Sequence, residues 1–160
     1  MSSTPATTAL DRAGVGYTLQ AYDHDAATSQ AVGYGAEAAI ALGVDPGQVL
    51  KTLVVDVDGT LVVAVVPVTG RLDLKAVAAA AGGKRATMAE PAAAQRATGY
   101  VVGGISPLGQ RRRHLTVVDS GAAALETVLV SAGRRGLDVE LAAADLVRLT
   151  RAVVAPIASA

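Results

Sequence analysis

The sequence predicts a mixed α+β fold in which helices surround a largely antiparallel sheet. The main observation is a pair of β-branched runs, Val49–Val57 and Leu61–Val68, which are joined through Asp58-Gly59. Asp-Gly between two apolar runs is a strong signal of a two-residue hairpin, so we expect a buried antiparallel pair. Helical and extended patterns do not alternate strictly, which argues against a doubly wound parallel sheet. With 160 residues, the chain has the length of one compact domain, 1–160.

Local signals delimit the other elements. Gly43 follows the helical pattern Tyr34–Leu42 at the position where a left-handed cap is favoured, and Pro91 is suited to the first turn of a helix. Asp73 precedes an apolar run and can cap the helix that follows. The remaining elements that we expect are a helix over Thr7–Ala13, a turn and strand over Gly14–Tyr22, a helix over Asp73–Ala81 that stops at Gly82, a helix over Glu90–Ala97, strands over His114–Asp119 and Thr127–Ser131, and a helix over Glu140–Leu149 with Asp138 just before it.

Composition excludes several classes of protein. The chain has no cysteine, which excludes disulfides, a thiolate nucleophile and cysteine-bound metals and fits a reducing cytoplasm. His24 and His114 are its two histidines, so we expect neither a metal centre nor a cofactor. The segment Met1–Ala6 lacks the charged and apolar regions of a signal peptide, and no apolar stretch approaches the ~20 residues that span a bilayer. We therefore expect a cytoplasmic protein without membrane contact.

Three segments are hard to explain by packing alone. Tyr100–Gly109 holds three glycines and a proline, which indicates a rigid loop with exposed backbone amides. Leu50–Leu53 places Lys51 in an apolar run, and Ser131–Asp138 is a second glycine-rich turn that ends in a carboxylate. We expect the three to form one site. A tyrosine near it would be informative, because the chain has four tyrosines and neither Phe nor Trp.

The charges balance overall but cluster locally. Fourteen basic and 14 acidic residues give a net charge of zero, so the chain as a whole has no strong attraction to nucleic acid. Basic clusters occur at Lys84–Arg85, Arg111–Arg113 and Arg134–Arg135, and the last two flank the glycine-rich segments. Two interpretations stay open: solvated turns that protect a sheet edge, or weak phosphate contacts at the rim of a site.

One motif suggests a different enzyme. Val54–Thr60 contains D-x-D-G-T after an apolar strand, which resembles the first motif of the haloacid dehalogenase phosphatases. In that family the motif leads into a loop and a helix, whereas here Leu61–Val66 returns at once as a strand. No convincing later acidic pair for magnesium follows. We therefore interpret Asp58-Gly59 as a plain hairpin turn.

The chain also contains an ordered set of blocks, namely Tyr22–Asp25, Gln48–Leu53, Pro67–Lys75, Met88–Pro91, Gln95–Gln110 and Arg135–Leu141. As a set, these blocks resemble the YbaK/EbsC family, free-standing relatives of the editing domain of bacterial prolyl-tRNA synthetases. The match covers nearly the whole chain and is closest to the Cys-tRNA(Pro) deacylase branch. The resemblance implies the fold of that editing domain and a trans-editing activity that removes mischarged cysteine from tRNA(Pro), and from tRNA(Cys) as a further substrate.

The resemblance also implies roles for particular residues. Lys51 would supply positive charge near the ester or the terminal phosphate. Asp138 would pair with the α-ammonium of the substrate, although a helix cap explains this aspartate nearly as well. Matching positions of the family give two sets: a catalytic set of Lys51, Gly103, Gly104, Ile105, Ser106 and Pro107, and a substrate-binding set of Tyr22, Thr52, Ser131, Gly133 and Asp138.

In the route implied by the family, the substrate thiol attacks its own carbonyl and forms a thiolactone, so the protein needs no nucleophile. His24 lies between two aspartates, but we expect an exposed turn there rather than a catalytic triad. The implied partners are the aminoacylated 3′ end of a tRNA and, as a further candidate, prolyl-tRNA synthetase, which would present the substrate.

Alternatives remain open at this point. The same fold could hydrolyse Ala-tRNA(Pro) or another small aminoacyl ester with water as the attacking group, or it could bind an aminoacyl or nucleotide end without turnover. Ala132 departs from the family pattern, in which glycine is common, and would alter amino-acid preference if it borders the pocket. Thr28–Gly35 also diverges and is a candidate for part of the pocket wall.

Overall fold

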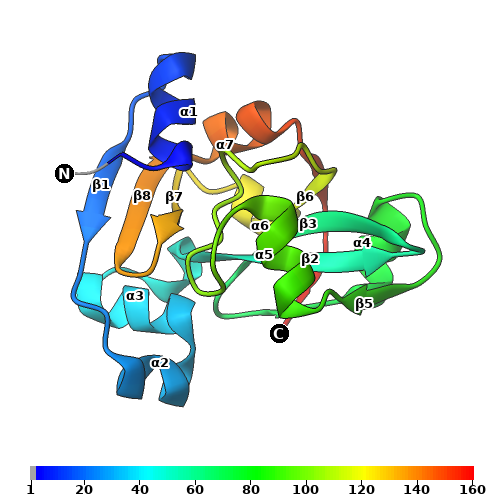
Figure 1. Cartoon of the computed structure of the whole chain (residues 1–160), viewed down its shortest axis with the longest axis horizontal. Coiled ribbons are helices and arrows are strands. Elements are labelled where there is room, and N and C mark those ends of the chain that lie inside the picture. Colours follow the sequence, from blue (N-terminus) through cyan, green and yellow to red (C-terminus); the bar gives the residue numbers. More distant parts are fainter. Residues whose placement is uncertain (1–2) are drawn as a thin grey trace.

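The computed structural model describes residues 3–160, and Figure 1 shows two sheets side by side with helices packed around them. Helix α1 (Pro5–Ala13) begins at a capping box formed by Thr4 and Thr7 and ends at Gly14 in the left-handed conformation. The helix expected from Thr7 is therefore confirmed, and it begins at Pro5 because proline is suited to the first helical turn.

The smaller sheet of the described residues has three antiparallel strands in the order β1-β8-β7. Strand β7 continues three residues beyond the expected end at Ser131, through a bulge, before the turn to β8. The strands are β1 (Thr18–Ala21), β7 (Thr127–Arg134) and β8 (Leu137–Ala142).

Strand β8 corrects the expected helix over Glu140–Leu149. Helix α7 spans Ala143–Thr150, so the residues from Glu140 to Ala142 are extended. Val139 is buried in the core while Asp138 and Glu140 point to the other face, a period of two that pairing with β1 and β7 stabilises. Asp138 therefore lies in the middle of a strand, and its interpretation as a helix cap is wrong.

The larger sheet of residues 3–160 has five strands in the order β5-β2-β3-β6-β9. The hairpin is confirmed, because Val57 pairs with Thr60, and Asp58 and Gly59 turn with φ of 52° and 91°. Strand β6 pairs in parallel with β3 and β9, so the sheet is mixed, in agreement with the expected fold class. Its strands are β5 (Ala86–Met88), β2 (Leu50–Val57), β3 (Thr60–Pro67), β6 (Thr116–Asp119) and β9 (Val153–Ala155); a separate short pair joins β4 (Arg71–Leu72) to β10 (Ala158–Ser159).

The acidic side chains of the D-x-D-G-T motif serve this hairpin. The Asp56 carboxylate accepts a hydrogen bond from the backbone N–H of Gly59 at 2.7 Å. The Asp58 carboxylate accepts from the N–H groups of Lys84 and Arg85 at 2.7 and 3.1 Å and so fastens the segment before β5. The motif is explained by local structure, as the sequence predicted.

The helices largely follow their local signals. Helix α3 has the expected bounds, Tyr34–Leu42, and the Asp73 side chain caps α4 by accepting from the N–H of Ala76 at 3.0 Å. Helix α2, which Asp25 caps, and helix α6 were not expected, because both are short and lack a clear apolar period. The remaining helices are α2 (Ala26–Val32), η1 (Pro46–Gln48), α4 (Leu74–Ala80), α5 (Pro91–Thr98) and α6 (Ser120–Ala123).

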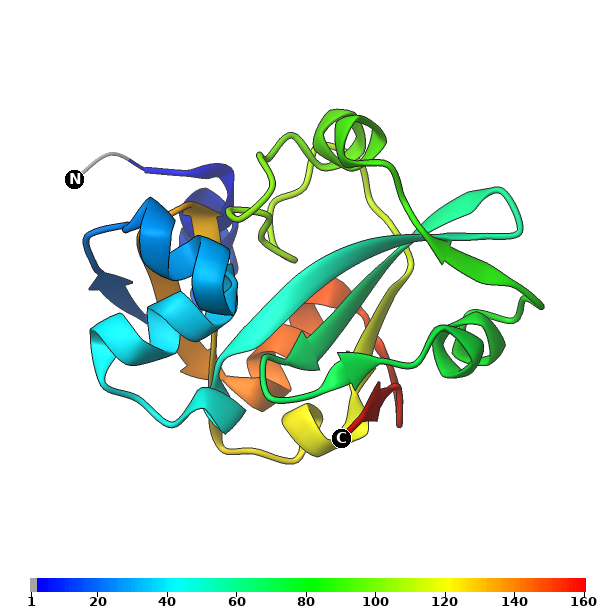
Figure 2. The ribbon, with the colours of Figure 1, turned by 90° about the horizontal axis from the view of Figure 1, so that it is seen from below.

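Small aliphatic side chains fill the core in two main layers. One layer lies between the two sheets, where Val65 of β3 and Val130 of β7 are fully buried. Buried residues of α1 and α7 pack in the same cluster. The other lies between the larger sheet and α4, where Val55 and Val77 are fully buried. Figure 2 shows that β2 runs from the side of the molecule that holds α2 and α3 into the larger sheet, so that its first residues approach these helices. Over residues 3–160, no helix has the length and apolar character that a membrane span requires.

Candidate active site

A cavity of about 360 Å³ lies where the two sheets, α3, α5 and the glycine-rich loop meet. Its wall includes Tyr34 and Gly35, so the expectation that Thr28–Gly35 forms part of the pocket is confirmed for its end. Seven of the residues predicted for the site line this cavity, namely Tyr22, Lys51, Thr52, Gly103, Ile105, Ser131 and Asp138.

Four predicted residues lie elsewhere. Ser106 is fully buried, and its hydroxyl accepts from the N–H of Leu108 at 3.2 Å, so it braces the loop from inside. Pro107 lines a separate hollow. Gly104 and Gly133 are outside the cavity wall: Gly104 lets the backbone at Arg134 approach closely, and Gly133 makes room for the side chains of Tyr100 and Thr4. Sequence spacing correctly located this loop but could not indicate which of its residues turn toward the cavity.

Strand β2 exposes an open edge to the cavity. On the side away from β3, residue Val49 bridges to Leu129 of β7, and β5 pairs only with Val55–Val57. Val68 N–H donates to the Val49 carbonyl, so odd-numbered residues of β2 exchange hydrogen bonds with β3. By this alternation, the N–H and C=O of Thr52 point to the open edge. The Thr52 Oγ1 is also buried without a hydrogen-bond partner in the described structure.

Lys51 precedes this threonine and is half-buried. Burial lowers the pKa of its ammonium, and the nearby Arg71 lowers the pKa further. Among residues 3–160, Lys51 has no ion-pair partner. A partly desolvated cation without a counter-ion is well suited to bind an anionic or strongly polarised oxygen.

Asp138 faces the cavity from the other sheet. It lies opposite Ser131 and Gln20 in the register of β7 and β1, and 6 % of it is exposed. Burial raises the pKa of its carboxyl group to about 7. No described residue forms an ion pair with it. Burial and the charge of Asp138 also raise the pKa of the Tyr22 phenol to about 12, which keeps this hydroxyl protonated as a donor.

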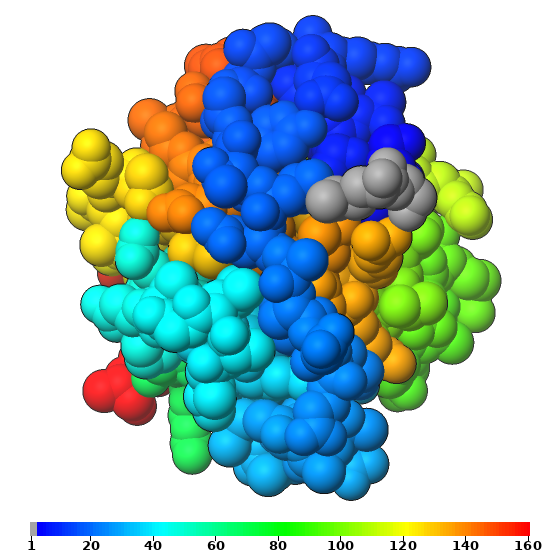
Figure 3. All heavy atoms as spheres, turned by 90° about the vertical axis from the view of Figure 1, so that its left-hand side faces the viewer, coloured from blue at the N-terminus to red at the C-terminus, as the bar shows by residue number. Residues whose placement is uncertain are grey.

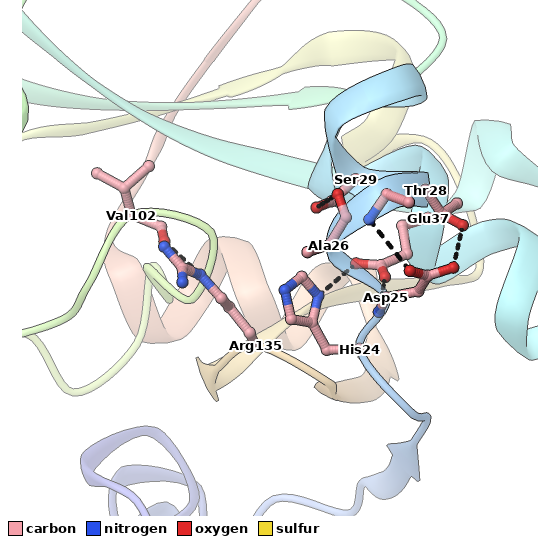
Figure 4. Close-up of polar contacts among 9 residues, drawn as sticks. His24, Asp25, Ala26, Thr28, Ser29, Glu37, Val102 and Arg135 are labelled. Carbon is pink, nitrogen blue, oxygen red and sulfur yellow. Dashed lines mark hydrogen bonds and ion pairs between the residues drawn. The ribbon is translucent and has the colours of Figure 1, made fainter.

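The glycine-rich loop approaches Tyr34 of α3 closely. Gly103 has φ of 89°, and a Cβ there would lie 2.7 Å from the Tyr34 ring, so any other residue would be strained and would clash. Arg135, in the β7–β8 turn, contacts both the glycine-rich loop and Tyr34. Its Nε donates to the carbonyl oxygen of Val102 at 2.9 Å (Figure 4). Its guanidinium lies 4.9 Å from the centre of the Tyr34 ring.

His24 supports this wall from behind. Its Nδ1 lies 2.9 Å from Glu37 Oε1 (Figure 4). Its ring stacks on Tyr34 with 5.9 Å between centroids. Glu37 is buried and also accepts from the N–H of Asp25. Figure 3 shows the strand-to-helix segment of these residues lying over the β7–β8 hairpin. Asp23, His24 and Asp25 are exposed, so the segment is the exposed turn that the sequence predicted rather than a triad, and His24 is not part of the cavity wall.

Sequence reasoning included Tyr34 only as part of the segment Thr28–Gly35 and gave it no role of its own, and it missed Glu37. The scarcity of tyrosine was the signal for Tyr34, whereas nothing in a single helix turn indicated that Glu37 would be buried against His24. Ala132, whose departure from the family pattern raised doubt about specificity, is fully buried in the core and does not border the cavity.

The cavity thus brings a cation from one sheet and a carboxyl group from the other to a single apolar space with free backbone groups. Such an arrangement can hold a small ligand that carries an ammonium and a polarised oxygen. Within the described residues, no group of three or more His, Asp or Glu side chains is arranged to hold a metal ion.

Comparison with known proteins identifies the family of this chain. Residues 28–149 match the model of the aminoacyl-tRNA editing domain. The chain therefore belongs to the aminoacyl-tRNA editing domain family, and the expected resemblance is confirmed.

Relatives support the same assignment. A protein of Enterococcus faecalis (strain ATCC 700802 / V583), named "Putative Cys-tRNA(Pro)/Cys-tRNA(Cys) deacylase EbsC", is 38% identical over 117 residues, which cover 72% of this chain and 71% of the relative. The crystal structure of a "putative trans-editing enzyme for prolyl tRNA synthetase" is 25% identical with a TM-score of 0.82 over all of both chains. The structure of "hypothetical protein APE2540" is 29% identical with a TM-score of 0.85, covering 98% of this chain and all of the other.

Proposed function

We propose that the protein removes mischarged cysteine from tRNA(Pro), with Cys-tRNA(Cys) as a further substrate. The reaction class is that of its family, because an editing domain deacylates aminoacyl-tRNA. The observation that carries the finer proposal is the placement of Lys51 and Asp138, from two different sheets, around one small cavity. We place the activity in the cytoplasm, where aminoacyl-tRNA is used, and propose that prolyl-tRNA synthetase presents the substrate.

The α-ammonium of the substrate would pair with Asp138. A carboxyl group whose pKa is about 7 is only partly ionised when the cavity is empty, and an arriving cation favours its charged form. The Tyr22 hydroxyl, which also lines the cavity, would donate a hydrogen bond to an acceptor atom of the substrate. In this role Asp138 fixes which end of the amino acid lies against the smaller sheet.

The ester would lie toward the open edge of β2. Lys51 stabilises negative charge as it develops on the carbonyl oxygen, and the backbone of Gly103 and Ile105 closes around the ribose. Gly104, Ser106 and Pro107 shape and fasten this loop rather than contact the amino acid, and Gly133 makes room in β7 for the side chains of Tyr100 and Thr4. The catalytic assignment therefore narrows to Lys51, Gly103 and Ile105.

For a cysteinyl ester, the substrate supplies the nucleophile. Its thiolate sulfur bonds to the carbonyl carbon, the bond from that carbon to the ribose oxygen breaks, and the ribose oxygen takes up a proton. The products are a thiolactone, which water later opens, and tRNA with a free 3′ hydroxyl. The protein contributes orientation and charge, which agrees with its lack of cysteine.

Water-dependent hydrolysis of Ala-tRNA(Pro) is the second candidate. The unpartnered Thr52 Oγ1 favours it, because this hydroxyl together with Ser131 on the cavity wall could hold a water molecule near the ester. Both candidates use the same cavity and differ in the attacking group.

The test compares deacylation of Cys-tRNA(Pro) and Ala-tRNA(Pro) by the wild type and by Lys51→Ala, without added metal. We expect rapid loss of the cysteinyl ester and a large decrease in Lys51→Ala. Lys75→Ala, which removes an exposed lysine of α4, serves as the matched control and should keep full activity. Preference for the alanyl ester would move the function to water-dependent editing. Binding without turnover of either ester would indicate a recognition module.

A further inference from the structure

Charge is distributed unevenly along this neutral chain. Residues 84–118 contain six of the 14 basic residues but one of the 14 acidic residues, Glu90. The rest of the chain carries eight basic and 13 acidic residues. The segment that includes α5 and the glycine-rich loop is therefore a positive region within a molecule that is otherwise negative.

Four arginines of this region are exposed on one part of the surface, which we call the arginine surface: Arg96, Arg111, Arg112 and Arg113. Arg111 N–H donates to the carbonyl oxygen of Thr98 at 2.9 Å, so the end of the loop is fastened to the end of α5. The residue just before Arg111 is fastened to the loop as well, because Gln110 Nε2 donates to the Ser106 carbonyl at 2.9 Å. The arginines are thus presented by a braced backbone.

The arginine surface borders two hollows that meet at Arg112. One, of about 300 Å³, is lined by Gln110, Arg112, Arg113 and His114 among others. The second, of about 450 Å³, lies between Arg96 of α5 and Arg111 and Arg112 of the loop. Both hollows are therefore lined by arginines and are large enough for a phosphate.

No acidic side chain neutralises these arginines. The ion pairs within residues 3–160 join His24 to Glu37 and Arg148 to Asp145, and neither involves the arginine surface. The neighbouring Gln110 carries no charge, and its Oε1 accepts a hydrogen bond from His114 Nδ1 at 2.8 Å. The guanidinium groups are free to bind an external anion.

The arginine surface is also close to the cavity. Pro91 and Ala94 of α5 line the cavity, whereas Ala93 and Arg96 of the same helix line the second hollow. An α-helix with its side chains is about 10–12 Å across, so the two sites are separated by roughly one helix diameter. A polymer whose end enters the cavity would pass over the arginines.

We propose that the arginine surface binds the phosphate backbone of the RNA whose aminoacylated end occupies the cavity. This inference rests on the proposed function. Guanidinium groups match phosphate oxygens with paired donors, and phosphate contacts position a nucleic acid without reading its sequence. The surface thereby holds the acceptor end of tRNA in place while the cavity selects the amino acid.

The first test measures binding of uncharged tRNA(Pro) by fluorescence anisotropy at several salt concentrations. Arg112→Gln/Arg113→Gln should raise Kd about tenfold at low salt and make the slope of log K against log salt shallower by about two. Arg112→Lys/Arg113→Lys should keep most of the slope, because lysine also neutralises phosphate. The control Lys75→Gln/Arg148→Gln removes the same charge elsewhere and should behave as the wild type.

The second test separates the surface from the cavity. With full-length Cys-tRNA(Pro), Arg112→Gln/Arg113→Gln should raise KM and leave kcat unchanged, and with a short cysteinylated 3′ fragment it should match the wild type. An unchanged Kd, slope and KM in an active protein would overturn the arginine surface and leave the proposed function intact. If tRNA binding shows the expected salt dependence and the expected loss in the variant, but the wild type deacylates no substrate, the arginine surface is supported and the proposed function is overturned.

Discussion

The two halves of strand β2 belong to one continuous element but have opposite surroundings. Residues Val55–Val57 are paired on both sides, with β3 and β5, and Val55 is fully buried. Residues Lys51–Leu53 are paired on one side, contain a desolvated cation, and include a buried hydroxyl without a partner. The difference indicates that the closed half stabilises the fold, whereas the open half retains unsatisfied groups that a substrate can satisfy.

The largest expected effect is on catalysis in the open half. Lys51→Ala should lower kcat/KM for Cys-tRNA(Pro) by about 10²–10³, the usual consequence of removing one group that stabilises a developing oxyanion. The free energy of unfolding should change little, because this lysine has no ion-pair partner in residues 3–160. Deacylation assays and denaturant unfolding measure the two quantities. A variant that unfolds readily would contradict the division between the two halves.

Across the cavity, Asp138 should make stability depend on pH. Its pKa is raised from 3.8 to about 7 in the folded state, so the folded protein binds more protons than the unfolded chain between these values. Stability from this group is therefore present below pH ~4 and lost as the pH rises through about 7, by a few kcal/mol at most.

Asp138→Asn removes this titration, so the variant should gain stability relative to the wild type as the pH rises from 4 to 8. Unfolding curves at several pH values give the difference between the two proteins. Asp145→Asn, at an exposed ion pair of α7, is the control and should show no such trend. Equal pH profiles for wild type and Asp138→Asn would refute the buried, unpaired carboxyl group.

A substitution in the closed half of β2 should lower stability and spare activity, the opposite of the result expected for Lys51→Ala. Val55→Ala removes two buried methyl groups and should cost about 2 kcal/mol of unfolding free energy. The kcat of the folded variant should remain near that of the wild type, because Val55 does not line the cavity. Chemical denaturation and a deacylation assay at low temperature check both parts. A large loss of kcat in folded Val55→Ala would show that the two halves are coupled.

The smallest expected effect concerns Thr52. Thr52→Val keeps the shape of the side chain and removes a buried hydroxyl without a partner, so stability should be unchanged or rise by up to about 1 kcal/mol. Activity should fall at the same time if the hydroxyl contacts substrate or water. Thr60→Val, at an exposed position of the same hairpin, is the control. A clear loss of stability in Thr52→Val would mean that the hydroxyl is satisfied in the folded protein.

Much of the fold could be predicted because its signals are local. Asp58-Gly59 determines the hairpin through its positive φ angles, and Asp73 and Gly43 delimit helices through their own backbone bonds. The ordered blocks also predicted one site for Lys51 and Asp138, and both residues line the same cavity. Each of these features depends on residues that are close in sequence or that form a recognisable set.

Tertiary structure decided the rest. Glu140–Ala142 is extended because β1 and β7 lie on either side of it, a fact that local propensity cannot contain. The parallel neighbours of β6, the inward turn of Gly103 and the burial of Ser106 likewise depend on partners far along the chain. Sequence alone therefore determined which residues could form the site. Long-range packing decided which of them face the cavity, because only the folded chain brings the two sheets together.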